Sequence, residues 1–301
     1  MKNIIITGGS GFIGSHLAKK LNKKYKILII DPNSNQELNK YKNIYFYNSN
    51  LSKKILLKKK FEFLIHLGAV SHDKDFRKNI FESYKINLNS TINALDLASN
   101  LKVKNFIFAS TEWVYGDDNK SKFLNERSLI NRDSILSDYA YSKILCEDLI
   151  KKSYLRKLIK NYIILRFGII YGSRTKGCAV EGIFNEIIKK NSVVINGSLN
   201  NSKKYLHVED LTEAIIKSLK IKKPRILNLC NTQLFSIKQI INECKKYTNK
   251  KIKFTNINKT YINTRNVSNA KAKKILKWMP KVSLKKGIKK IFYEIYKKNN
   301  Y

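Results

Sequence analysis

Short apolar runs alternate with helical patterns along the first two thirds of the chain. The runs have the length of β-strands and lie at Ile4–Ile6, Ile27–Ile30, Ile44–Tyr47, Phe63–Leu67, Phe106–Ala109, Tyr162–Leu165 and Ile226–Cys230. Apolar residues recur at helical spacing most clearly over Phe12–Leu21, Ile86–Leu97 and Tyr141–Leu158. Continuous apolar strands joined by helices indicate a parallel sheet that is buried on both faces. The pattern therefore predicts an α/β protein with a Rossmann-type, doubly wound parallel sheet.

The alternation loosens after Gly172, and a length of 301 residues allows two domains. We expect residues 1–171 to form the Rossmann domain. Its sheet should be re-entered at about 205–234, through Leu206–Ile216 and Ile226–Cys230. Residues 172–204 and 235–301 should form a smaller C-terminal lobe that binds the substrate.

The composition adds a strong positive charge, with 60 Lys and Arg against 22 Asp and Glu, or +38. Hydrophobic residues still make up 43% of the chain, which excludes a disordered protein. Only eight of the basic residues are Arg, the residue that base and phosphate recognition relies on. No basic segment carries a known nucleic-acid motif. We interpret the lysines as a solvated surface and expect no specific nucleic-acid partner; weak attraction to polyanions is the by-product.

Membrane and metal sites are not expected either. No apolar run approaches the ~20 residues of a membrane helix, and the first residues lack a signal peptide. A cytoplasmic protein is therefore predicted. The four cysteines are widely spaced without a CxxC pair, which favours reduced thiols. The four histidines show no metal-ligand spacing.

The first predicted strand runs directly into a glycine-rich turn, Thr7–Gly14. Gly8, Gly11 and Gly14 have the spacing of a dinucleotide-binding fingerprint: a tight turn, close approach to the pyrophosphate, and close helix–strand packing. The amino terminus of the following helix then faces the anion. Asp31 closes the second strand; its oxygens suit a ribose 2′-hydroxyl and would repel a 2′-phosphate. These residues predict NAD as the cofactor. The alternative is that the glycines form only a structural turn and that Asp31 is a solvated surface residue.

A Tyr-x-x-x-Lys step formed by Tyr139 and Lys143 is the strongest candidate for catalysis. Residues four apart share one face of a helix. A nearby ammonium and the positive nicotinamide ring both favour a phenolate, so we expect a lowered pKa for Tyr139, suited to proton transfer. Tyr141 does not fit this role, because Leu145 occupies the position four residues beyond it.

Seven motifs in order extend this constellation over nearly the whole chain. They are TGGSGFIGSHL at Thr7–Leu17, HLGA at His66–Ala69, STEWVYG at Ser110–Gly116, YAYSKILCE at Tyr139–Glu147, LRFGIIYGSR at Leu165–Arg174, YLHVEDL at Tyr205–Leu211 and KAKKILKWMPKVSLKKGI at Lys271–Ile288. With these motifs the sequence resembles the extended short-chain dehydrogenase/reductase family, and within it the NAD-dependent nucleotide-sugar epimerases and dehydratases.

The resemblance implies three catalytic residues, Thr111, Tyr139 and Lys143. It implies hydride transfer from sugar C4 to NAD while Tyr139 removes the hydroxyl proton, Thr111 hydrogen-bonds the 4-hydroxyl, and Lys143 also binds the nicotinamide ribose. The alternative for Thr111 is a strand-end hydroxyl that satisfies local backbone. Asn50 replaces an Asp that usually meets the adenine, and Asn87 is interpreted as structural. The expected cofactor-binding residues are Gly8, Gly11, Phe12, Ile13, Gly14, Asp31, Asn50, Leu51, Leu67, Ala69, Tyr139 and Lys143.

The pair Glu112-Trp113 separates the subclasses. Family 4,6-dehydratases place a Glu at the position of Trp113 to abstract the C5 proton, a related decarboxylase keeps that Glu, and an indole accepts no proton. Glu112 precedes it on an expected extended segment and should face the opposite way. We therefore expect a 4-epimerase, similar to UDP-glucose 4-epimerase, acting through a transient 4-keto sugar. A C4 dehydrogenase or ketoreductase is the alternative, a 4,6-dehydratase is less favoured, and a non-enzymatic NAD- or RNA-binding protein is least favoured.

The partner implied by the resemblance is a nucleotide-diphosphate sugar. The expected substrate-binding residues are Thr111, Glu112, Trp113, Lys203 and Arg265. Lys203 aligns with an Arg that often grips the diphosphate, and supplies charge without a bidentate fork. Arg265 is the best remaining Arg for the second phosphate, with a solvated loop residue as the alternative. A homodimer through helices such as Phe81–Ser99 and Tyr141–Leu158 is also expected.

Overall fold

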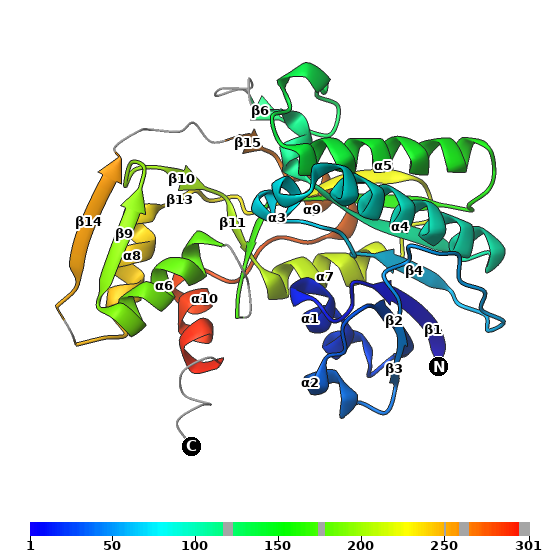
Figure 1. Ribbon diagram of the computed structural model, residues 1–301, viewed down its shortest axis with the longest axis horizontal. Coiled ribbons are helices and arrows are strands. Elements are labelled where there is room, and N and C mark those ends of the chain that lie inside the picture. The colour runs from blue at the N-terminus through cyan, green and yellow to red at the C-terminus, as the bar shows by residue number, and fades with distance from the viewer. Residues whose placement is uncertain (117–122, 174–177, 250, 259–264, 295–301) are drawn as a thin grey trace. The chain divides into compact units, whose positions relative to one another are not determined.

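The computed structural model describes residues 1–116, 123–173, 178–249, 251–258 and 265–294. Arg174, the last residue of one motif, and residues 295–301 of the expected lobe lie outside this range. The chain divides into two compact units (Figure 1). Unit 1 comprises Met1–Asp117, Glu126–Phe167 and Thr212–Asn228, and unit 2 comprises Asp118–Asn125, Gly168–Leu211 and Leu229–Tyr301.

Unit 1 is built on a seven-stranded sheet with the order β12-β7-β5-β4-β1-β2-β3. The strands are β1 (Lys2–Thr7), β2 (Tyr25–Asp31), β3 (Ile44–Asn48), β4 (Phe63–His66), β5 (Asn105–Thr111), β7 (Tyr162–Phe167) and β12 (Arg225–Leu229). Strands from β7 to β3 pair in parallel, and Ile5 of β1 lies opposite both Leu28 and Leu64. The order reverses between β1 and β4, so the carboxyl ends of these strands flank the position where doubly wound folds bind ligands. The predicted α/β fold with a parallel sheet is confirmed.

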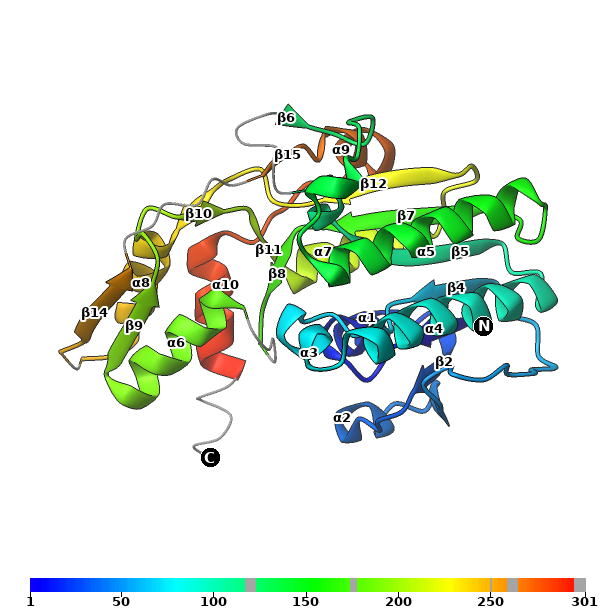
Figure 2. The ribbon, with the colours of Figure 1, turned by 45° about the horizontal axis from the view of Figure 1, so that its top comes forward.

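The helices of unit 1 include two that carry most of the candidate chemistry, α4 (Ile80–Asn100) and α5 (Asp138–Leu155). They pack against each other, α4 contacts β4, and α5 contacts β5 and β7 (Figure 2). The Ser137 hydroxyl caps α5 by accepting the Ala140 N–H, which places the helix three residues earlier than predicted. The remaining helical segments are α1 (Phe12–Leu21), α2 (Gln36–Asn39), α3 (Asp73–Lys78), η1 (Glu112–Tyr115), η2 (Arg132–Ser134) and α7 (Val208–Ser218), whose first four residues belong to unit 2.

A continuous apolar core joins the sheet to α4 and α5. Phe106 and Phe108 of β5 are fully buried, and they share this core with Ala94 of α4 and Ile150 of α5. Burying a Phe or Ile side chain stabilises the fold by about 1.5–3 kcal/mol relative to leaving it exposed. The core therefore holds the sheet-facing side of α5 rigidly against the end of β5, and that side carries Lys143.

The described residues of unit 2 form short strand pairs and the helices that pack beside them. Its strands are β6 (Phe123–Leu124), β8 (Ile169–Tyr171), β9 (Ser192–Asn196), β10 (Ser202–Lys203), β11 (Tyr205–His207), β13 (Phe235–Ser236), β14 (Lys253–Asn258) and β15 (Asn266–Val267). Its helices are α6 (Ala179–Lys190), α8 (Ile237–Lys245), α9 (Ala270–Leu276) and α10 (Leu284–Phe292). A second apolar core lies among α6, α8 and α10, with Phe184, Ile240 and Ile288 fully buried.

One expected return to the main sheet is wrong. Ile226–Cys230 does supply β12, but Leu206–Ile216 does not enter the sheet of unit 1. Instead β11 pairs with β8 in a separate two-stranded sheet, and the chain continues as α7. Val208, Leu211 and Ile215 recur at three- and four-residue spacing, so the run buries one stripe of a helix rather than a strand.

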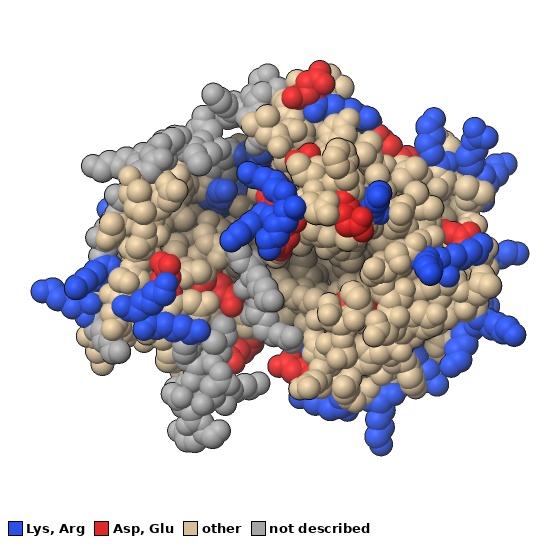
Figure 3. All heavy atoms as spheres, viewed as in Figure 1, with Lys and Arg blue, Asp and Glu red and all other residues tan. Residues whose placement is uncertain are grey.

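The excess of basic side chains is visible on the molecular surface. On the face shown in Figure 3, Lys and Arg are scattered over both units and do not gather in one patch. Within the described part of the chain, no helix combines the length and the apolar character needed to cross a membrane.

Candidate active site

The glycine-rich turn after β1 requires glycine on steric grounds. Gly8 has φ +67°, and a Cβ there would lie 2.6 Å from the backbone nitrogen of Gly68. A Cβ on Gly14 would lie 2.3 Å from the carbonyl oxygen of Gly8. The Gly8 N–H donates to the Ile30 carbonyl at 2.9 Å, which fixes the turn against β2. The backbone is therefore packed as closely as the fingerprint predicts.

The amino terminus of α1 is suited to an anion. Gly11 is the exposed N-cap residue, no side chain caps the helix, and its first turn contains no acidic residue. Phe12 and Ile13 follow half-buried. The first N–H groups of a helix have no partner within the helix itself. A helix of ten residues directs its positive end toward such an anion. These features fit the pyrophosphate of a dinucleotide.

The Asp31 carboxylate is held next to this turn. Its Oδ2 accepts the Ser10 N–H at 3.1 Å, and its Oδ1 accepts the Asn33 N–H at 2.9 Å. Asn35 Nδ2 in turn donates to the Ser10 carbonyl at 3.0 Å. Each carboxylate oxygen keeps a lone pair for a ribose hydroxyl. Sequence reasoning missed Ser10 and Asn35; the run of Asn and Ser after Asp31 was the available signal, since such residues fold loops onto their own backbone.

Two further expected cofactor segments follow the ends of β3 and β4. Asn50 is exposed, and its Oδ1 accepts the Ser52 N–H at 2.9 Å. Leu51 is buried, and its carbonyl accepts from Asn93 Nδ2 of α4 at 2.7 Å. Leu67 and Ala69 are half-buried directly after β4. All of these residues lie at the carboxyl edge of the sheet, the same edge as Gly8 and Asp31.

Asn87 of α4 connects the loop after β4 to α5. Its Oδ1 accepts the Val70 N–H at 2.8 Å, and its Nδ2 donates to the Val70 carbonyl at 3.2 Å and to Ser142 Oγ at 3.0 Å. Ser142 Oγ donates onward to the Tyr139 carbonyl at 2.7 Å. These contacts are the kind that a structural Asn makes, and they couple the first turn of α5 to the sheet edge.

Tyr139 and Lys143 are brought together on α5. The Lys143 ammonium lies 4.6 Å from the centre of the Phe108 ring on β5 and 5.8 Å from the centre of the Tyr139 ring. Lys143 is buried and Tyr139 is half-buried. Since α5 also packs against η1, the helix places both residues beside the end of β5.

Burial dominates the protonation of both groups. It lowers the pKa of Lys143 to about 8, against the opposing influence of Cys146 and Glu147. It raises the pKa of Tyr139, because the phenolate is the charged form. The expectation that the Lys143 ammonium lowers the Tyr139 pKa is therefore corrected, because desolvation sets the direction of the shift.

His66 at the end of β4 is a neutral, buried partner of this region. Burial and then the charge of Lys143 lower its pKa to about 3. Its Nδ1 lies 2.6 Å from Thr7 Oγ1 and its Nε2 lies 3.1 Å from Thr91 Oγ1. Thr7 Oγ1 also accepts the Gly68 N–H at 3.3 Å, so the imidazole helps to join β1 to the loop after β4.

Thr111, Glu112 and Trp113 lie where β5 turns into a 3₁₀-helix. Thr111 is buried, and its Oγ1 accepts the Trp113 N–H at 3.2 Å, which leaves the hydroxyl hydrogen to be donated. Glu112 is buried and Trp113 is half-buried. The expected extended segment is wrong, because η1 begins at Glu112. Adjacent side chains on a 3₁₀-helix are turned by about 120°, so Glu112 and Trp113 still diverge but do not oppose each other.

Lys203 and Arg265, the expected diphosphate residues, both belong to unit 2. Lys203 ends β10 and lies opposite Phe235 of β13, while half-buried Arg265 directly precedes β15. The intervening Lys204 ammonium donates to Asn266 Oδ1 at 2.9 Å and to the Val267 carbonyl at 2.8 Å. The structure therefore brings the two basic segments next to each other within this unit.

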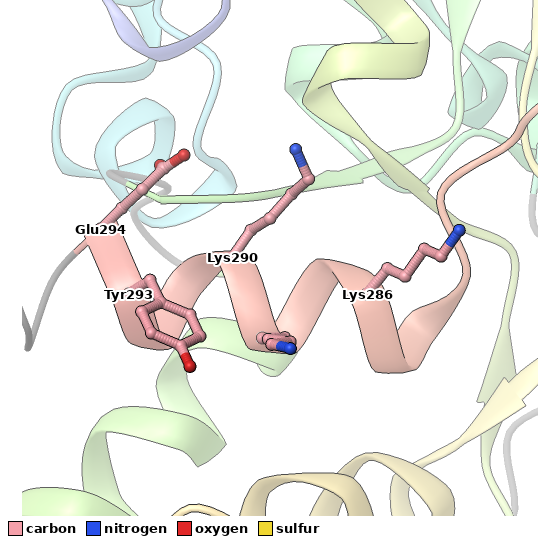
Figure 4. A pocket seen from close by; sticks show the side chains of 5 residues that line it. Lys286, Lys290, Tyr293 and Glu294 are labelled. Atoms are coloured by element: carbon pink, nitrogen blue, oxygen red, sulfur yellow. The ribbon is translucent and has the colours of Figure 1, made fainter.

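Unit 2 also has a hollow of about 270 Å³ along α10. It is lined by Lys286, Lys289, Lys290, Tyr293 and Glu294 (Figure 4). Lys290 is paired with Glu209 at 2.6 Å, and the hollow contains none of the residues predicted for the site. Within the described residues no group of three or more His, Cys, Asp and Glu side chains is arranged to hold a metal ion.

Comparison with known proteins decides the family. The model of the NAD dependent epimerase/dehydratase family matches residues 4–230. The chain belongs to this family. It is accordingly an NAD-dependent enzyme of the nucleotide-sugar epimerase/dehydratase group, and the glycine turn with Asp31 fits that cofactor.

Curated relatives of this family member include both subclasses. A dTDP-D-glucose 4,6-dehydratase of Dictyostelium discoideum is 32% identical over 77% of this chain, but the chain spans only 58% of that relative's length. A putative UDP-glucose 4-epimerase of Methanocaldococcus jannaschii is 28% identical over 96% of both chains. A solved UDP-glucose 4-epimerase of Thermotoga maritima, with UDP-glucose, superposes with a TM-score of 0.86 at 26% identity and covers 99% of this chain and 100% of its own.

Proposed function

We propose that this family member is a nucleotide-sugar 4-epimerase that works through a transient 4-keto sugar. The observation that carries the proposal is Trp113, a half-buried indole two residues after Thr111 at the end of β5. Elimination across C5 and C6 needs a base at C5, and an indole cannot serve, because its nitrogen lone pair belongs to the aromatic ring and the N–H only donates. Epimerisation at C4 needs only oxidation, rotation of the keto sugar and reduction from its other face.

The chain supplies the groups for this chemistry from β5 and α5. The turn from Gly8 to Gly14 and Asp31 would hold NAD, which would supply the acceptor for the C4 hydride and the source of its return. Tyr139 takes the proton of the 4-hydroxyl and later gives it back, while the Thr111 hydroxyl hydrogen-bonds the same oxygen. The buried Lys143 ammonium stabilises the phenolate that forms. The raised pKa of Tyr139 makes this charge support a requirement of the reaction.

The proposed substrate is a nucleoside diphosphate sugar. The solved Thermotoga maritima relative contains UDP-glucose, and a UDP-glucuronic acid 4-epimerase of Bacillus cereus contains UDP-glucuronic acid and NAD, with 25% identity and a TM-score of 0.84. In this chain Lys203 and Arg265 are the proposed partners of the diphosphate, and unit 2 is the proposed substrate lobe. Both residues are positively charged, which suits two adjacent phosphates.

Proton NMR of the products tests the proposal. The protein is incubated with UDP-, GDP- and CDP-hexoses, and the expected product is inverted at C4 with its 6-hydroxyl intact. A methyl doublet from a 4-keto-6-deoxy sugar would show a dehydratase, with Glu112 or another group as the base. Stoichiometric formation of NADH without inversion would show a C4 dehydrogenase instead. Tyr139→Phe is the inactive control for either reaction.

We also propose a homodimer through α4 and α5. The outer side of α4 exposes Phe81 and Ile92, with 81% and 47% of their surface accessible. On the neighbouring α5, Tyr141 and Leu145 are half-exposed on the side that faces away from the sheet. Apolar side chains on two adjacent helices suit a second copy of the same surface.

A further inference from the structure

Glu147 lies one helical turn after Lys143 on α5 and is almost fully buried, with 1% of its side chain exposed. Its Oε1 accepts hydrogen bonds from Ser110 Oγ at 2.6 Å and from Arg166 Nε at 2.9 Å. Its Oε2 accepts a hydrogen bond from Arg166 Nη2 at 2.7 Å. Both carboxylate oxygens are therefore engaged in short, charge-assisted hydrogen bonds. Ser110 is the residue directly before Thr111, so this carboxylate ties α5 to the end of β5.

Arg166 on β7 is fixed from its other side. Its guanidinium lies 4.9 Å from the centre of the Tyr115 ring on η1, and the Tyr115 hydroxyl donates to Asn228 Oδ1 of β12 at 2.9 Å. Burial alone would lower the pKa of Arg166, but the charge and hydrogen bonds of Glu147 raise it. The ion pair thus links α5 to β7 within unit 1, and Ser110 links it to the strand that ends at Thr111.

The groups that face Lys143 come from three elements. Tyr139, Cys146 and Glu147 lie on α5 itself, His66 faces it from β4, and the Phe108 ring lies against it from β5. Burial raises the pKa of Cys146 and lowers that of His66, so both are neutral near pH 7. Among the described residues that act on the Lys143 pKa, Glu147 is therefore the group that carries a negative charge near pH 7.

We propose that Glu147, held by Arg166 and Ser110, is a positioning residue that keeps the Lys143 ammonium charged beside Tyr139 and fixes the end of β5 at Thr111. The proposal rests on the proposed catalytic roles of these three residues. Glu147 follows Lys143 by four residues, so the two side chains share one face of α5 and the carboxylate lies near the ammonium. The same carboxylate accepts the Ser110 hydroxyl, which connects it to the strand that ends at Thr111.

The test measures the protonation of Lys143 directly. The ¹³Cε resonance of Lys143 is assigned by its loss in Lys143→Arg and titrated in the NAD-saturated protein. In Glu147→Gln its pKa is expected to fall by about one unit, the scale of losing a nearby opposite charge. Asp148→Asn is the matched control, because Asp148 is the next carboxylate on α5 but pairs at the surface with Arg132 and Lys151, of which Lys151 also lies 3.7 Å from Glu147 Oε2; it should leave the Lys143 pKa unchanged.

The pH dependence of turnover is a second test of the role of Glu147. The wild-type rate should fall as pH rises through about 8, where Lys143 loses its proton. In Glu147→Gln this fall should occur about one pH unit lower, so the ratio of variant to wild-type rate rises toward one as the pH is lowered to 6. A purely structural role predicts a ratio that does not change with pH.

The Glu147→Gln protein could fail to fold, because Arg166 would stay buried without its partner. A second variant keeps the proposal testable in that case. Glu147→Gln/Arg166→Gln removes both charges together. Loss of the Arg166 charge opposes loss of the carboxylate, but Glu147 is the one of the two that acts on Lys143, so the Lys143 pKa should still fall, by less than in Glu147→Gln. An unchanged Lys143 pKa in a folded variant would overturn the proposal, even if 4-epimerisation is observed. A lowered pKa without any epimerase activity would leave this role of Glu147 standing and refute the proposed function alone.

Discussion

At Tyr139 a single oxygen atom separates the catalytic hypothesis from a structural one. Tyr139→Phe removes the hydroxyl but keeps the ring near Lys143, so folding and NAD binding should persist. Turnover should fall at least ~100-fold, as expected for the loss of a positioned acid/base. Steady-state rates and NAD titrations check both statements. Tyr141→Phe is the matched control; damage there with a harmless Tyr139→Phe would show that the register on α5 is wrong.

We expect the buried Lys143 ammonium to lower the free energy of unfolding. Its pKa is about 8 in the folded protein against 10.5 for an ordinary Lys, so below pH 8 the buried charge is fully present. As pH rises from 8 to 10.5 the folded protein loses this proton first, and the penalty disappears. Lys143→Met should therefore raise the free energy of unfolding by about 3 kcal/mol at pH 7, and by about half of that at pH 9.5.

Urea denaturation at the two pH values measures this gain. Lys152→Met, which removes an exposed lysine from the same helix, should change the stability by less than about 0.5 kcal/mol. An equal gain at both pH values for Lys143→Met would mean that packing, not the buried charge, is responsible.

At the scale of single residues, the sequence predicted which positions need glycine better than it predicted the pKa values of buried side chains. Gly8 and Gly14 follow from spacing alone, because the fingerprint encodes close approach of main chain to main chain. The raised pKa of Tyr139 could not be predicted from its neighbour four residues away. Desolvation depends on which elements cover α5, and that packing is not a property of the local sequence.

At the scale of elements, long apolar runs were predictable and short segments were not. The seven strands of the sheet lie where continuous Ile, Leu and Phe runs predicted them, since a strand covered on both faces has no polar alternation. The four residues of η1 and the three of β11 are too short to show a period. Their conformation depends on caps such as Thr111 and on distant partners such as β8.

The contact between α1 and the turn after β1 predicts a sharp difference between two glycines. In Gly14→Ala the new Cβ would lie 2.3 Å from Gly8 O and 2.6 Å from Gly9 Cα, both backbone atoms, so α1 must shift. Stability should fall by about 1–3 kcal/mol and NAD affinity should fall with it. Gly182→Ala on α6 meets nothing within 4 Å and should instead stabilise by up to about 1 kcal/mol.

Thermal unfolding with and without NAD distinguishes these effects. A Gly14→Ala protein with normal NAD affinity would contradict the assignment of this turn to the cofactor. The Gly182→Ala protein controls for the general effect of adding a methyl group to a helix.

For the whole molecule, sedimentation velocity tests the proposed homodimer. The wild-type protein should sediment with twice the mass of the chain, and Ile92→Lys should sediment as a monomer, because a charge is placed within the apolar contact. Leu56→Lys, at another exposed apolar position of unit 1, should remain dimeric. A monomeric wild-type protein would refute the proposal.

The charge of +38 predicts only salt-sensitive association with nucleic acids. Contacts from scattered lysines gain their energy from counterion release, so binding should weaken steeply between low and physiological salt. Electrophoretic mobility shifts with unrelated DNA and RNA sequences measure this. A complex that selects one sequence and survives physiological salt would show a dedicated interface instead.

The two tryptophans give each compact unit its own optical probe. Trp113 lies half-buried beside Thr111 in unit 1, whereas Trp278 is buried in unit 2 with its indole Nε1 donating to the Asp210 carbonyl at 3.0 Å. In Trp278→Phe the remaining emission comes from the indole at the end of β5. In Trp113→Phe it comes from the core of the other unit. Because indole emission shifts to longer wavelength when water reaches the ring, intrinsic fluorescence of these two proteins follows the unfolding of each unit separately, without an added label.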